Sequence, residues 1–162
     1  MIAQRPADRA VPPTHVTAMA RFERFFRAAA GVDIDKEDLK RYRDFVNHKI
    51  RDLLARAEAV AKANGRSVIE YIDLPITKGL QESIHRFREI DQTIALTQIL
   101  DGLIERPPFD LYPSEETDAQ LPAVAGGLSV ALARTFKLID PDLKNPQASH
   151  WQRSLQIFDL LL

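Results

Sequence analysis

The chain has 162 residues, 45% of them hydrophobic and 28% charged, which is the composition of a globular protein rather than a disordered one. It contains no cysteine, which excludes disulfides and thiolate metal sites and suits a reducing cytoplasm, where we expect the protein to reside. No apolar run reaches the roughly 18–20 residues that span a bilayer, and the N-terminus lacks the order of a signal peptide, so we expect no contact with a membrane.

Charge is spread unevenly along the chain. Residues 1–90 carry 17 Lys and Arg against 13 Asp and Glu, whereas residues 91–162 carry 5 against 10. Two interpretations remain open at this point: two solvated faces of opposite sign, or an asymmetric surface for a partner or for DNA.

The chain begins with a proline-rich segment and a short helix. Residues 1–17 contain three prolines and no hydrophobic period, which predicts a flexible tail. A helix is expected at about 19–30, with Phe22, Phe25 and Phe26 at helical spacing. Gly31 can adopt the left-handed conformation that ends it.

A long helix follows at about 36–64. Asp35 has the position of its N-cap, with Asp38 three residues later. At 1.5 Å per residue this helix would be roughly 43 Å long. Its apolar positions recur at steps of three and four, which predicts a stripe that packs along a partner helix. The stripe consists of Leu39, Tyr42, Val46, Ile50, Leu53, Ala57 and Val60.

A link and a third helix complete the first half. Gly65 ends the long helix, and residues 67–72 are short and β-prone. The third helix is expected to begin at Asp73, because the proline two residues later is tolerated in a first turn. Its buried face would comprise Ile76, Leu80, Ile84, Phe87 and Ile90.

The second half repeats this plan. A short helix is expected at about 92–105, stopped by the proline pair that follows it. A loop at 106–117 leads to a long helix at about 118–139, and a last helix follows Pro146.

Two short–long–short triplets can cover each other's apolar stripes, whereas one triplet cannot cover its own. We therefore predict an all-α fold of two helix–long helix–helix units, residues 18–90 and 91–162, around one shared core. Gly126 and Gly127, inside the second long helix, each cost roughly 0.8–1 kcal/mol against Ala. A close crossing of the two long helices would explain them, and a local kink is the alternative.

The link between the second and third helices resembles the loop of archaeal histones. Those proteins carry Gly-Arg-Lys-Thr-Ile followed by an Asp, and the matching residues here are Gly65, Arg66, Ser67, Val68, Ile69 and Asp73. The resemblance implies that Arg66 and Asp73 clamp the loop against the next helix. Where the family has a Thr that touches phosphate, this chain has Val68, and Ser67 replaces the neighbouring Lys.

From about residue 20 to 162 the chain is similar to a bacterial family of uncharacterised histone-fold proteins, which place two histone folds in one polypeptide. This resemblance implies a histone fold arranged as an intrachain pseudodimer. The stretches that carry it are 64–66, 73–84, 126–136 and 140–146.

No residue constellation indicates catalysis, a cofactor or a metal site. The four histidines, His15, His48, His85 and His150, have no His or carboxylate partner at a metal-ligand spacing such as the i, i+4 of H-E-x-x-H, and we interpret none of them as a ligand. No nucleophile elbow or glycine-rich phosphate loop occurs. We therefore expect no catalytic residue, no cofactor and no enzymatic activity.

The cations in the first half make DNA binding a more specific hypothesis than a general protein-interaction role. The candidate contacts are Arg21, Arg24, Arg27, Lys36 and Lys40. Asp33 and Asp35 precede the long helix and would repel phosphate. We expect a protein-interaction or structural module that binds a protein partner or self-associates. The alternative is a histone-like nucleoid protein that binds DNA weakly and without sequence preference.

Overall fold

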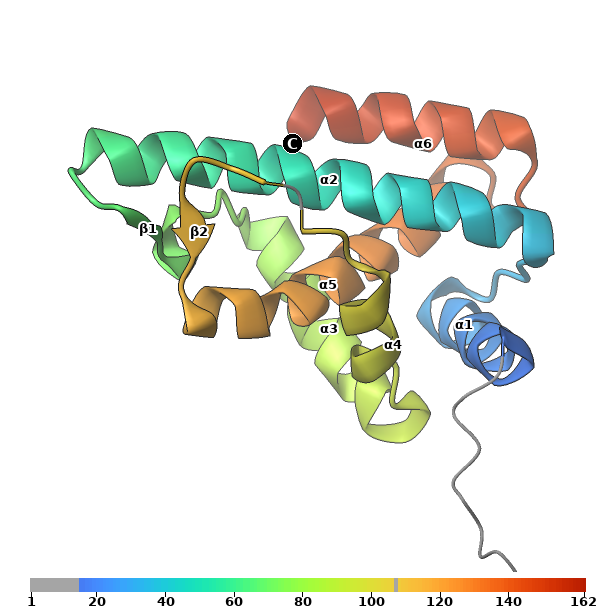
Figure 1. Cartoon of the computed structure of the whole chain (residues 1–162). Helices are drawn as coiled ribbons and strands as arrows, with labels where there is room; N and C mark the ends of the chain where they lie inside the picture. Colours follow the sequence, from blue (N-terminus) through green and yellow to red (C-terminus); the bar gives the residue numbers. More distant parts are fainter. Residues whose placement is uncertain (1–14, 107) are drawn as a thin grey trace, which may run out of the picture.

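The computed structural model describes residues 15–106 and 108–162, and these form an all-α fold, as predicted (Figure 1). The expected tail lies outside the described residues except for its last three, which begin the first helix. The helices are α1 (His15–Ala30), α2 (Lys36–Ala63), α3 (Lys78–Ile94), α4 (Thr97–Leu103), α5 (Glu115–Ile139) and α6 (Ala148–Leu161). Two-residue strands lie at β1 (Val68–Ile69) and β2 (Tyr112–Pro113).

The long helix α2 has the bounds that its cap residues predict. The Asp35 carboxylate accepts from the Asp38 backbone N–H, and the Asp38 carboxylate accepts from the Asp35 N–H, each at 3.0 Å. This reciprocal pair satisfies donors that a helix N-terminus leaves free. Gly65, at φ +70°, turns the chain away at the other end.

The second long helix, α5, crosses α2 near the middle of the molecule (Figure 1). At this crossing the hydroxyls of Tyr42 and Ser129 are hydrogen-bonded at 2.6 Å and buried. α6 lies along α2 on the other side, where the Phe45 and Phe158 rings meet edge-on with centroids 4.9 Å apart. α5 is long and apolar enough to cross a membrane, but 61% of its most apolar stretch is buried here, as in a core helix.

Each loop that precedes a long helix pairs with the loop that follows the other one. β1 pairs in parallel with β2, with Val68 opposite Tyr112 and Ile69 opposite Pro113. At the far end the Asp33 N–H donates to the Lys144 carbonyl at 2.7 Å. The two triplets are therefore joined at both ends of the long helices.

Two residues, Ala95 and Leu96, connect the triplets. Ala95 adopts a left-handed conformation with φ 55°. The Asp91 carboxylate accepts from the Leu96 N–H at 2.6 Å, and Arg21 of α1 donates to the Ala95 carbonyl at 3.0 Å. Side chains from α1 and α3 thus hold this joint in place.

Four predicted helix starts differ from the structure. The first helix begins at His15 rather than at about 19, and at each of the other three a side-chain hydrogen bond to the first turn accompanies the observed boundary. The third helix begins at Lys78 rather than at Asp73, because Asp73 closes a 3₁₀ turn (Tyr71–Asp73) and Thr77 caps the helix. The helix expected at 92–105 covers only Thr97–Leu103, since α3 continues to Ile94 and the Asp91 carboxylate accepts from the Thr97 N–H. α5 begins at Glu115 rather than at 118, because the Ser114 hydroxyl accepts from the Thr117 N–H at 3.1 Å.

The glycine pair marks a close helix crossing, but not with the expected partner. A Cβ on Gly126 would lie 2.3 Å from the Phe87 ring, and one on Gly127 would lie 2.4 Å from the Ile84 side chain. Both of these neighbours belong to α3, so the close approach is that of α3 to α5 and not that of α2 to α5.

Candidate functional site

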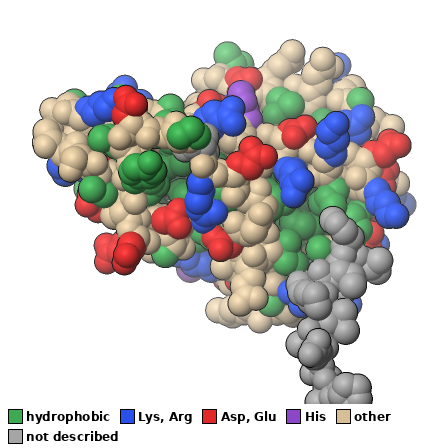
Figure 2. Space-filling view, in the orientation of Figure 1, with side chains coloured by type: hydrophobic (Ala, Val, Ile, Leu, Met, Phe, Trp, Pro, Cys, Tyr) green, Lys and Arg blue, Asp and Glu red, His purple; other side chains and the backbone are tan. Residues whose placement is uncertain are grey.

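A groove of about 690 Å³ lies between α1, the first half of α2 and α4. Figure 2 shows it as a patch of hydrophobic side chains flanked by Lys and Arg. We call it the basic groove. It is lined by Ala18, Arg21, Phe22, Lys36, Leu39, Lys40, Arg43, Gln98, Ile99, Gly102 and Leu103.

The floor of the basic groove is apolar because it is formed by side chains at the edge of the core, where α1, α2 and α4 meet. Phe22 is buried against Tyr42, with ring centroids 5.2 Å apart. Leu39, which the sequence pattern places on the buried stripe, is only partly buried and packs at the edge of the core, as does Ile99 of α4. Asn47 fixes the end of α4 against α2, since its side chain donates to the Leu103 carbonyl at 3.2 Å.

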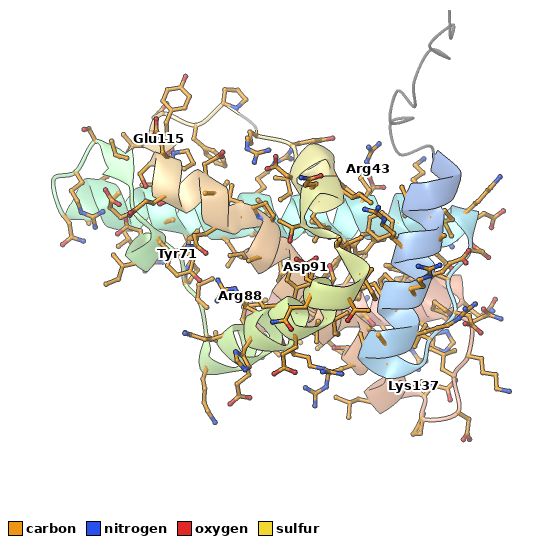
Figure 3. All side chains as sticks on the ribbon, turned by 90° about the horizontal axis from the view of Figure 1, so that it is seen from below. Arg43, Tyr71, Arg88, Asp91, Glu115 and Lys137 are labelled. Atoms are coloured by element: carbon orange, nitrogen blue, oxygen red, sulfur yellow. The ribbon has the colours of Figure 1, made fainter. Side chains whose placement is uncertain are left out.

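The rim of the basic groove carries positive charge that no described carboxylate pairs with. Lys36, Lys40 and Arg43 recur at steps of four and three, so they share one face of α2. None of the three forms an ion pair with any residue in the ranges 15–106 and 108–162. No Asp or Glu occurs among the described lining residues. Figure 3 shows Arg43 on α2 beside α1 and α4.

The five cations predicted to contact DNA are separated by the structure. Arg21, Lys36 and Lys40 all line the basic groove. Arg24 is exposed but lies outside the groove lining. Arg27 forms an ion pair with Asp33 at 2.7 Å, and the hydrogen bond to this carboxylate raises the pKa of the guanidinium.

Arg43 belongs to the groove but not to the predicted set of contacts. The signal was present in the sequence, because Arg43 is three residues after Lys40 and seven after Lys36, on the same helical face. The contribution of α4 carried no such signal, since only the fold brings Ile99 and Gly102 to this helix.

Arg66 and Asp73, the predicted loop clamp, are brought together in the structure. Both guanidinium Nη atoms donate to the two carboxylate oxygens, and one of these bonds measures 2.5 Å. Asp73 also accepts from the Glu70 N–H at 2.8 Å. The Asp73 side chain is 1% exposed, whereas that of Arg66 is 35% exposed. The guanidinium at the surface therefore balances the charge of a buried carboxylate. The hydrogen bonds from Arg66 are the main cause that lowers the pKa of Asp73.

Beside this clamp, the β1–β2 end offers little positive charge to a polyanion. Lys62 pairs with Asp110 at 3.0 Å and with Glu58 at 3.3 Å. Val68 and Tyr112, opposite each other in the strand pair, are exposed and cannot supply a cation.

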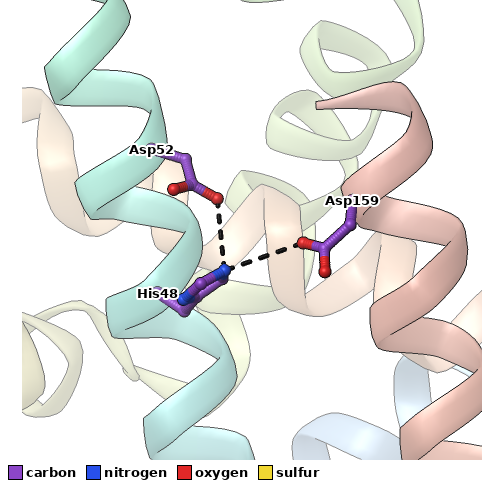
Figure 4. Close-up of side chains that lie close together, drawn as sticks. All are labelled: His48, Asp52 and Asp159. Carbon is purple, nitrogen blue, oxygen red and sulfur yellow. Dashed lines mark ion pairs between the residues drawn. The ribbon is translucent and has the colours of Figure 1, made fainter.

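One cluster at the α2–α6 contact was not predicted from the sequence (Figure 4). His48 Nε2 lies 3.4 Å from Asp52 and 3.7 Å from Asp159, so the view that no histidine has a carboxylate at ligand spacing is wrong here. The buried Lys49 ammonium donates to both carboxylates. Hydrogen bonding from Lys49 is the main cause that lowers the pKa of Asp159. A metal ion would compete with this ammonium, so we interpret the cluster as a fastening of α6 to α2.

A model of the family described as a domain of unknown function, DUF1931, matches residues 22–159. The structure is similar to a crystal structure from Thermus thermophilus, with a TM-score of 0.79, 52% sequence identity, and coverage of 89% of this chain and 97% of that chain. A crystal structure of an Aquifex aeolicus protein has the same TM-score of 0.79 at 25% identity, covering 94% and 99% of the two chains. An uncharacterised protein of Aquifex aeolicus strain VF5 is 28% identical over 117 residues, which span 72% of this chain and 68% of that protein.

Proposed function

The chain belongs to the DUF1931 family, and we propose that this member is a non-catalytic protein-interaction module whose docking surface is the basic groove. The observation that carries the proposal is the combination of three cations, Lys36, Lys40 and Arg43, with an adjoining apolar floor. Such a surface suits a partner that offers both apolar side chains and negative charge.

We also propose that the scaffold is a pair of histone folds in one chain. Two short–long–short triplets and the pairing of loops at both ends support this interpretation. In this arrangement the second triplet completes the core of the first and supplies α4 as one wall of the groove.

The apolar floor favours a protein over DNA as the main partner. Burial of apolar surface favours association with a protein, whereas a phosphate backbone has little apolar surface to bury there. At the paired-loop ends Arg27 and Lys62 already have carboxylate partners, Asp33 and Asp110. The positive charge at these two ends is therefore partly neutralised.

Capture of partners from a nuclease-treated native lysate tests the proposal. The double variant Lys40→Glu/Arg43→Glu should lose a protein that the wild-type chain retains. The matched control, Arg51→Glu/Arg56→Glu, makes the same charge change at exposed sites on the same helix outside the groove lining, and should retain it. Equal capture by both variants would contradict the assignment of the groove.

The second candidate function is weak, one-sided DNA binding. It is favoured by the convergence of Arg21, Lys36 and Lys40, three of the five predicted contacts, on one surface. We expect affinity no tighter than about 10⁻⁴–10⁻⁶ M at physiological salt, falling steeply as salt rises, because each phosphate contact releases counterions. A mobility-shift titration across salt concentrations measures this. Tight binding that persists at high salt would make DNA the primary partner.

A further inference from the structure

We propose that the basic groove binds an acidic amphipathic α-helix of a partner protein. The inference rests on the proposed function and adds the chemical class and the secondary structure of the occupant. Three features of the groove support it: the charge of the rim, the chemistry of the floor and the length of the cation row.

The positive charge of the rim favours an occupant with negative charge. Some surface cations, such as Arg27, Lys62 and Arg106, are matched by carboxylates at 2.7–3.0 Å, whereas Arg51 and Arg56 form no ion pair with a described residue. The groove differs from these sites because it gathers its cations around one hollow. Lys36, Lys40 and Arg43 have no such partner within the part of the chain that the structure describes. Unbalanced charge around one groove attracts an anionic partner and repels a cationic one.

The floor selects an occupant that also carries apolar side chains. Leu39 lies between the cations in sequence, and Phe22 and Ile99 line the same groove from α1 and α4. Phe22 is already buried, but a segment that covered only the cations would leave the partly exposed Leu39 and Ile99 in water. A segment with apolar residues on one face and carboxylates beside them would bury the floor and pair with the rim at the same time.

The length of the cation row matches helical geometry. From Lys36 to Arg43 the row rises by roughly 10 Å along α2, which is close to two turns of an α-helix. Apolar residues at positions i, i+3, i+4 and i+7 of a docked helix cover the same distance. An extended peptide would place its alternate side chains on the solvent side and use fewer of them on the floor.

Fluorescence anisotropy with the full chain and a synthetic helix tests the inference. The probe is a labelled, end-capped peptide of about 18 residues, long enough to form an isolated helix, with Leu at i, i+3, i+4 and i+7 and Glu on the flanking positions. The comparison peptide has the same composition, with the Leu residues spread around the helix. We expect the amphipathic peptide to bind at least about tenfold more tightly than the comparison peptide, because only it presents a continuous apolar face.

The variants locate the binding. Lys40→Glu/Arg43→Glu should weaken binding of the amphipathic peptide by about tenfold or more, since two attractions become repulsions. Leu39→Ser should weaken it at unchanged net charge, and Arg51→Glu/Arg56→Glu should leave it unchanged. Circular dichroism of each variant establishes that it is folded. Equal binding of the two peptides, or equal binding by the groove and control variants, would overturn the inference.

Two further probes separate this inference from its rivals and from the proposed function. The first probe is either dodecanoate, an anionic fatty acid, or duplex DNA. If one of them binds through Lys40 and Arg43 while the peptide does not, the helix assignment is overturned. Groove-dependent capture of a lysate protein without peptide binding would also overturn it, while leaving the proposed function intact. A photoreactive group on the central Leu of the peptide should crosslink to α4, and a crosslink elsewhere would contradict the docking site.

Discussion

At the scale of single residues, the Arg66–Asp73 pair has the clearest energetic role. Replacing Arg66 with Ala leaves a carboxylate that is 1% exposed without its bidentate partner. We expect a loss of about 1 kcal/mol in the free energy of unfolding, the value of the lost hydrogen bonds, because the Glu70 N–H still donates to Asp73 and Arg66 lies at the surface. Arg66→Lys keeps the charge but not the two-pronged geometry, so it should lose less. Urea unfolding measures both values. If Arg66→Ala is as stable as the wild type, Arg66 does not stabilise the loop.

The same pair predicts a dependence of stability on pH. The pKa of Asp73 is lowered in the folded state, chiefly by Arg66. The stability that this contributes is complete above the carboxyl's unfolded pKa, about 3.9, and is lost as the pH falls through the lower folded value. The drop in stability between neutral pH and the acid range should therefore be smaller in Arg66→Ala than in the wild type. Unfolding curves at both pH values test this, and equal drops would contradict it.

Sequence reasoning reached some of these residues and missed others for physical reasons. Arg66 and Asp73 lie seven residues apart around one loop, so a family pattern could relate them. The cluster of His48, Lys49 and Asp159 depends on how α6 docks on α2, and a chain separation of 110 residues between Lys49 and Asp159 leaves no local pattern. The i, i+4 spacing of His48 and Asp52 was readable, but it indicates only that two side chains are neighbours.

At the scale of elements, the α3–α5 crossing depends on the glycine pair. A methyl group at Gly126 would overlap the Phe87 ring, 2.3 Å away. We expect Gly126→Ala to destabilise the protein by about 1–3 kcal/mol, because overpacking outweighs the gain in helix propensity. Gly79→Ala is the matched control, since nothing lies within 4 Å of its added Cβ, and it should be neutral or stabilising. Thermal unfolding compares them, and a stable Gly126→Ala would argue against close packing.

The hydrophobic period predicted the long helices better than the short ones. α2 has 28 residues, so its stripe of apolar residues is unambiguous and its cap, Asp35, is recognisable. The short helix α4 has too few residues to display a period, and its start depends on Asp91, a side chain of the preceding helix. The glycine pair indicated a close crossing but not its partner, because more than one helix in the sequence could supply a facing stripe.

At the scale of the whole molecule, the two triplets share one core. Residues 1–90 alone would expose Tyr42 at the α2–α5 crossing and Phe87 at the α3–α5 crossing. We expect this fragment to be unfolded or self-associated, since its apolar faces lack their cover. Circular dichroism with light scattering measures both properties. A monomeric fragment that unfolds cooperatively would show that the first triplet folds without the second.

The short joint at Ala95 and Leu96 also determines how many partners one molecule can hold. Two identical chains related by a twofold axis would display every surface patch twice, and could therefore bridge two ligands. Here the halves differ in sequence and are joined covalently, so no internal twofold axis repeats the basic groove, which α1, α2 and α4 form within the described residues. A single copy of the chain would therefore occupy or mask one binding segment through this groove, and crosslinking two segments would require two copies of the chain.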